Sequence, residues 1–129
     1  MLKLLAKYSD VISSYKISRF EHFGQILRFR AELTLTDNTI LHVRETVLSM
    51  FVRKYSYHWQ DRSGKLIMRW DNAPDWAVET FPHHVHVGKE VTVEPSFDRT
   101  LDQVLNVVRR RLLKESLGKK GSHWAGSES

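Results

Sequence analysis

One stretch of the sequence decides the fold class: Leu27-Arg28-Phe29-Arg30-Ala31-Glu32-Leu33-Thr34-Leu35 alternates apolar and polar side chains without a break. Successive side chains of a β-strand point to opposite faces, so this stretch predicts a strand with one buried and one solvated side. Asp37-Asn38 follows and is typical of a hairpin turn, because asparagine tolerates a positive φ. The strand is therefore expected to belong to an antiparallel sheet.

The same alternation recurs on both sides of this strand. It predicts further strands over residues 11–20, 41–47, 51–60 and 65–70, with turns at 21–24 and 61–64. Glu45 falls on the otherwise apolar face of its strand. A buried carboxylate needs a partner, so we expect Glu45 either to pair with an arginine or to lie where the strand twists.

The two ends of the chain favour helices. Residues 2–8 can form one or two helical turns. Thr100-Leu101-Asp102-Gln103 matches a capping box, and the apolar residues after it recur at helical spacing up to a stop at Gly118. We therefore predict an α+β fold: an antiparallel meander of about five strands, a C-terminal helix packed on one face, and a short N-terminal helix. Residues 1–117 form the single domain and residues 118–129 a flexible tail.

The composition narrows the class of protein. The chain has 129 residues, no cysteine and a net charge of +5. The length suits one domain, and the absence of cysteine excludes disulfides and thiolate sites. No apolar run approaches a membrane span and no signal peptide is recognisable, so a cytoplasmic protein is expected. The charge favours an acidic partner such as RNA, although solubility alone explains it equally well.

Histidines gather in the irregular region expected over residues 71–88. His83, His84 and His86 follow Pro82, and in extended chain His84 and His86 point the same way. Three interpretations stay open for them. They can transfer protons in metal-independent RNA cleavage, bind a metal together with Asp71, or form structural hydrogen bonds within the loop.

The remaining candidate residues are cations, aromatics and amides near this region. Arg69 is expected to stabilise the phosphate charge, Asp71 to share in proton transfer and Tyr57 to position the substrate. The candidates for substrate binding are Arg44, Trp70, Asn72, Arg109 and Arg110. Several of these residues also have an ordinary explanation. The aromatic residues can simply form part of the core. The arginines of the last helix can be solvated charges that interact favourably with the helix dipole at its C-terminal end.

Two motifs together carry a resemblance to a known family. Asp71-Asn72-Ala73-Pro74 and Pro82-His83-His84-Val85-His86, with the strands around them, resemble the TumE-type toxin family over about residues 33–113. The resemblance implies a toxin–antitoxin locus and a helix-turn-helix antitoxin as partner. The sequence departs from the family at Asp75-Trp76, where members often carry two histidines.

The functional hypothesis combines these observations. It is the toxin of a type II toxin–antitoxin pair acting as a metal-independent ribonuclease without a cofactor, with RNA and a second copy of the chain as further candidate partners. One alternative is a non-enzymatic module that binds RNA or protein. A metal-dependent nuclease is the other.

Overall fold

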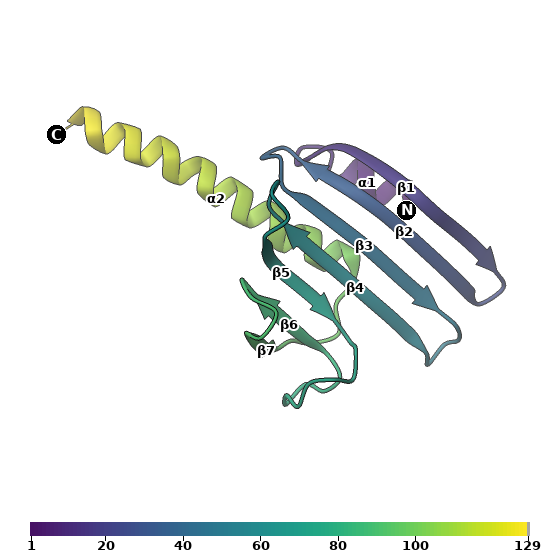
Figure 1. The fold of residues 1–129 in the computed structure, drawn as a ribbon. Coiled ribbons are helices and arrows are strands. Elements are labelled where there is room, and N and C mark those ends of the chain that lie inside the picture. The colour runs from purple at the N-terminus through teal and green to yellow at the C-terminus, as the bar shows by residue number, and fades with distance from the viewer. Residues whose placement is uncertain (129) are drawn as a thin grey trace.

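In the computed structural model, the backbone is described for residues 1–128 and the side chains for residues 1–117. Within these residues the chain forms one seven-stranded sheet, which one helix precedes and another follows in sequence. Strands that are neighbours in sequence are neighbours in the sheet (Figure 1). Every pair of neighbouring strands is antiparallel. The elements are α1 (Leu2–Lys7), β1 (Ile12–Phe23), β2 (Ile26–Leu35), β3 (Ile40–Val47), β4 (Arg53–Gln60), β5 (Leu66–Asp71), β6 (His84–Val87), β7 (Val93–Pro95) and α2 (Leu101–Glu128).

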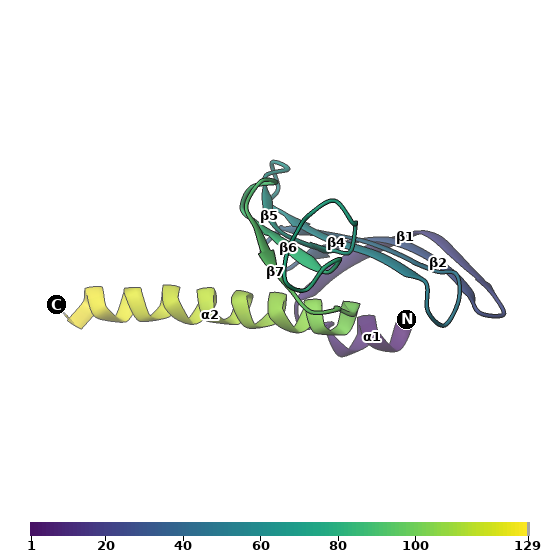
Figure 2. The same ribbon diagram turned by 90° about the horizontal axis from the view of Figure 1, so that it is seen from below.

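The core lies between one face of the sheet and the two helices. Figure 2 shows α1 and the first part of α2 beneath the sheet, while the rest of α2 extends past its edge. The helices contribute the buried residues Leu5, Tyr8, Leu101, Val104, Leu105, Val108 and Leu112. The sheet contributes Phe29, Leu33, Leu41, Val43, Tyr57, Trp59, Trp70 and Val85, among others. The opposite face of the sheet, called the open face below, carries no helix within the described residues (Figure 2).

The predicted meander with a helix at each end is confirmed, and the number of strands is seven rather than about five. The alternating segment that opened the sequence analysis is β2, and Asn38 has the expected positive φ of 70° in the turn that follows it. The two additional strands fall in and just after the region expected to be irregular. His84-Val85-His86-Val87 has strand alternation, but its histidines are buried, which a pattern based on solvated polar residues does not anticipate.

The C-terminal helix begins as predicted and ends later. The capping box forms in both directions: Thr100 N–H donates to Gln103 Oε1 at 3.0 Å and Gln103 N–H donates to Thr100 Oγ1 at 3.3 Å. The backbone then stays helical to Glu128, past the stop expected at Gly118. A glycine costs a helix only about 1 kcal/mol and does not end it alone. The side chains of 118–129 lie outside the described residues, so the flexible tail stays a prediction. No helix in the described part of the chain is long and apolar enough to cross a membrane.

Candidate functional site on the open face

Two rows of polar side chains cross the open face of the sheet. Residues paired directly across antiparallel strands lie on the same face, so the strand register itself builds the rows. From β1 to β6 the first row is Lys16, Glu32, His42, His58, Arg69 and His86. The second row, from β2 to β6, is Arg30, Arg44, Ser56, Asp71 and His84. Ionisable groups from six strands thus lie in two adjacent lines.

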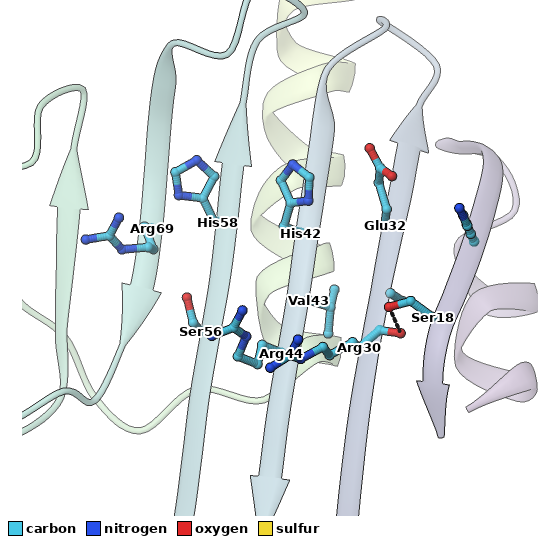
Figure 3. Close-up of a pocket in the computed structure, with 11 residues that line it drawn as sticks. Ser18, Arg30, Glu32, His42, Val43, Arg44, Ser56, His58 and Arg69 are labelled. Atoms are coloured by element: carbon cyan, nitrogen blue, oxygen red, sulfur yellow. Dashed lines mark hydrogen bonds between the residues drawn. The ribbon is translucent and has the colours of Figure 1, made fainter. Parts of the chain in front are cut away.

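The rows enclose a hollow of about 480 Å³ (Figure 3). Four cationic side chains line it, Lys16, Arg30, Arg44 and Arg69, against one carboxylate, that of Glu32. A second hollow of about 520 Å³ adjoins it, shares Arg30 and Arg44, and adds Lys54. The net positive lining makes this part of the surface suited to a polyanion.

His42 and His58 lie side by side in the hollow, on β3 and β4 (Figure 3). Their ring centroids are 5.9 Å apart and both side chains are half-buried. Burial lowers the pKa of His58 below its ordinary value, and the neighbouring Arg69 and His42 lower it further. His58 is therefore neutral at physiological pH and can accept a proton.

A buried cluster of Asp71, His84 and His86 lies where the rows reach β5 and β6. His84 Nε2 is 2.9 Å from Asp71 Oδ1, and His86 Nε2 is 3.4 Å from Asp71 Oδ2. The exposed fractions of the three residues are 6%, 0% and 1%. Trp76 covers the cluster, with its ring centroid 5.4 Å from that of His86. The two imidazoles are therefore closed to a large substrate in this conformation, whereas Asp71 also lines the second hollow.

Arg69 connects the buried cluster to solvent. Its Nε donates to Asp71 Oδ2 at 3.1 Å, and its terminal nitrogens donate to the Glu90 carboxylate at 2.6 and 2.5 Å. Hydrogen bonds from Arg69 hold the pKa of Glu90 below its ordinary value. Arg69, Asp71, His84 and His86, all candidates from the sequence, are therefore brought together in one cluster. Glu90 is a fifth member that the sequence analysis did not include.

Other predicted site residues lie elsewhere. Tyr57 and Trp70 face α2 and are 0% and 2% exposed. A substrate on the open face cannot touch them, because both side chains point into the core. His83 points away from the buried cluster, and its Nδ1 lies 2.9 Å from the Tyr55 hydroxyl.

The predicted residues in the last helix and in the loop after β5 have structural contacts. Arg109 pairs with Asp10 at 2.8 Å on the helix side of the molecule. Arg110 lies exposed on the same helix. The Asn72 side chain ties its loop to β4, donating to Arg53 O at 2.7 Å and accepting from Tyr55 N–H at 3.0 Å. Of the five substrate-binding candidates, Arg44 and Asn72 alone line a hollow on the open face among the described residues.

His42, His58, Lys16 and Arg30 were not among the site residues predicted from the sequence, although the sequence contains a signal for them. Alternation placed His42 and His58 on the polar sides of their strands, but it did not give the register between strands. The Asp37-Asn38 turn fixes that register, since it pairs Leu33 with Leu41 and thereby Glu32 with His42. Combining alternation with turn position would have aligned the row.

The family comparison agrees with the resemblance found in the sequence. A family model described as toxin TumE matches residues 1–112, most of the 129-residue chain. No curated protein and no solved structure matches the chain. The match covers every strand of the sheet and the part of α2 that is packed against it. The chain therefore belongs to the TumE toxin family, a family of toxins from toxin–antitoxin pairs.

Proposed function

We propose that this toxin is a cytoplasmic, metal-independent endoribonuclease of a type II pair, whose active site is the hollow on the open face. The observation that carries the proposal is the His42–His58 pair, with ring centroids 5.9 Å apart, in a hollow lined by four cationic side chains. RNA cleavage needs a proton acceptor, a proton donor and cations around the phosphate. This hollow offers all three.

The surroundings of His58 assign it the role of proton acceptor, and His42 takes the complementary role of proton donor. His58 is kept neutral by burial and by Arg69, so it accepts the proton of a ribose 2′-hydroxyl. The 2′-oxygen then forms a bond to phosphorus, and the bond from phosphorus to the 5′-oxygen breaks. His42, the other histidine of the pair, supplies the proton that the leaving oxygen takes up. The products are a 2′,3′-cyclic phosphate and a free 5′-hydroxyl.

The arginines hold the phosphate. Arg30 and Arg44 are exposed neighbours in the second row and line both hollows. Neither has a salt-bridge partner within the described residues. Their guanidinium groups are therefore free to bind phosphate oxygens in pairs. Arg69 is less free, because Glu90 and Asp71 already accept its hydrogen bonds.

This assignment moves proton transfer away from His84 and His86. Both were candidates from the sequence, but they are 0% and 1% exposed. His42 and His58 lie in the same row as His86, at a part of the row that lines the hollow. The antitoxin partner, proposed to be a helix-turn-helix protein, would neutralise the toxin by covering this face.

The test is cleavage of total and transfer RNA by the purified protein in Mg²⁺-free buffer. His42→Ala and His58→Ala are each expected to lower the cleavage rate by about 10²- to 10⁴-fold, the usual contribution of one proton-transfer group. The matched control is His22→Ala, which removes an exposed histidine of β1 outside the hollow. It should leave the rate unchanged.

The outcomes separate the enzyme from a binding module. Cyclic-phosphate products that disappear in both variants support the proposal, and growth arrest in cells should disappear with them. RNA that is bound but never cleaved by the unmodified protein would overturn it in favour of a non-enzymatic RNA-binding module. Equal cleavage by all three variants would move the chemistry to another part of the molecule.

A further inference from the structure

Three residues with potential ligand atoms converge in the buried cluster. Asp71 Oδ1 lies 2.9 Å from His84 Nε2, Asp71 Oδ2 lies 3.4 Å from His86 Nε2, and the two Nε2 atoms are 3.1 Å apart. One ligand atom from each residue lies within 4.8 Å of the others. Zinc–ligand bonds of about 2.0–2.1 Å in a tetrahedron place neighbouring ligand atoms roughly 3.3 Å apart. The observed separations are close to that value.

The backbone fixes which nitrogen of each imidazole faces the centre. His84 Nδ1 lies 2.9 Å from Pro82 O, and His86 Nδ1 lies 2.7 Å from Glu90 O. A carbonyl oxygen only accepts hydrogen bonds, so each Nδ1 carries a hydrogen. In a neutral ring the Nε2 atom then presents a lone pair. Metal-binding histidines are oriented in this way, through a hydrogen bond from the other nitrogen to a carbonyl or carboxylate.

Two lone pairs and a carboxylate facing one another require a positive charge among them, supplied by a proton or by a metal ion. The cluster is shielded from water by Trp76 and by its own burial. An unshared cluster of acceptors in such a place is strongly unfavourable. Arg69 supplies part of that charge, since its Nη2 lies 3.2 Å from His86 Nε2. Among the residues whose side chains are described, no cationic side chain contacts His84 Nε2.

We propose that Asp71, His84 and His86 form a binding site for a divalent transition metal, with Zn²⁺ as the ion that suits them best. Two imidazoles and one carboxylate are ligands that zinc accepts, and a water completes the tetrahedron. The metal joins β5 to β6 through their side chains and holds the segment around Trp76 in place. It does not touch RNA, so the site is independent of the chemistry assigned to His42 and His58.

Metal binding has a defined consequence for Arg69. Its Nη2 gives up the contact with His86 Nε2, because that lone pair now binds the metal. The two hydrogen bonds to Glu90 can persist, since they lie on the exposed side of the guanidinium. Arg69 therefore competes with the metal for Asp71 Oδ2 and His86 Nε2. The Arg69→Gln variant should bind zinc more tightly than the unmodified protein.

The experiment is a titration of the purified full-length protein with Zn²⁺, following bound metal by equilibrium dialysis and the melting temperature in parallel. One zinc per chain and a higher melting temperature are expected. His84→Ala should weaken binding by roughly 100-fold or more, because loss of a supporting group alone costs 10- to 100-fold. The matched control is His42→Ala, which removes a histidine from the accessible pair and should leave zinc binding unchanged.

A measurement on the unmodified protein covers the case in which His84→Ala does not fold. In nitrogen-labelled protein, zinc should shift the imidazole Nε2 resonances of His84 and His86 and leave those of His42 and His58 in place. Absence of zinc binding, or Nε2 resonances that show a bound hydrogen and do not respond to zinc, would overturn the proposal in favour of a protonated imidazole. Binding that is lost in His42→Ala and kept in His84→Ala would also overturn it.

Discussion

Tyr57 donates a hydrogen bond to the carboxylate of Glu45, twelve residues before it, on the face of the sheet that α2 covers. Arg53 completes the group: its Nη2 donates to the Tyr57 hydroxyl at 2.6 Å and lies 3.5 Å from Glu45 Oε1. Glu45 was the one carboxylate expected on an apolar strand face, with either an arginine partner or a twist of the strand to explain it, and the structure shows the arginine partner. Burial and the Glu45 charge raise the pKa of Tyr57, so its hydroxyl stays protonated and keeps donating.

Tyr57→Phe should therefore lower stability and not catalysis. The variant leaves a nearly buried carboxylate without one of its donors, which costs about 1.5–3 kcal/mol for a hydrogen bond to a charged group. Urea denaturation measures the loss, with Tyr15→Phe, a half-exposed tyrosine of β1, as a control that should change little. RNA cleavage per folded molecule should be unchanged. A folded, fully stable Tyr57→Phe protein without activity would restore the substrate-positioning role predicted from the sequence.

His58 should titrate below the ordinary histidine pKa of about 6.5. Its pKa is lowered first by burial and then by Arg69 and His42. Between about pH 7 and pH 5 the unfolded chain takes up a proton that the native state refuses, so stability falls as the pH falls through this window. His58→Gln should flatten that part of the curve. Histidine resonances followed by NMR give the midpoint directly, and a value above 6.5 would contradict the assignment of His58 as the proton acceptor.

The antiparallel meander could be predicted from the sequence because apolar and polar residues alternate along its strands and because its turns contain Asp, Asn and Gly. The sequence was insufficient at β6, where His84 and His86 occupy the positions that a pattern assigns to solvent. Their burial depends on Trp76, Arg69 and Glu90, which come from three separate segments. Such convergence follows from tertiary packing and not from local periodicity. Tyr57 was misplaced for a related reason, because aromatic residues suit a binding platform and a core equally well.

RNA affinity should depend on salt through Arg30 and Arg44. For single-stranded nucleic acid, each phosphate contact adds about 0.7 to the slope of log affinity against log salt concentration. Arg30→Gln and Arg44→Gln should each reduce the slope by about that amount. Fluorescence anisotropy of a labelled RNA, titrated with protein at salt concentrations from about 50 to 200 mM, gives the slope.

The matched control for these variants is Arg110→Gln. It removes the same charge from an exposed position of α2 and should leave the slope unchanged, since α2 packs against the other face. Arg110 was a substrate-binding candidate from the sequence alone. An equal effect of all three substitutions would mean that affinity reflects net charge and not the open face.

Alkaline pH should unfold the protein through tyrosines on its helix side. Burial and a hydrogen bond to Asp102 raise the pKa of Tyr8 to about 12, and burial raises that of Tyr55 to about 12. Since both pKa values exceed the unfolded value of about 10, the stabilisation is complete below pH 10 and is lost as the pH rises towards 12.

The Tyr8→Phe variant should be less stable at neutral pH, because Asp102 loses its 2.5 Å hydrogen bond, and its stability should decline less steeply at alkaline pH. The test is to record phenolate absorbance and circular dichroism together from about pH 9 to 12, the range that contains the unfolded and native pKa values of the tyrosines. Phenolate from Tyr8 and Tyr55 should appear only well above pH 10, and ionisation of either in the intact sheet near the unfolded value of about 10 would show that water reaches the junction between the helices and the strands.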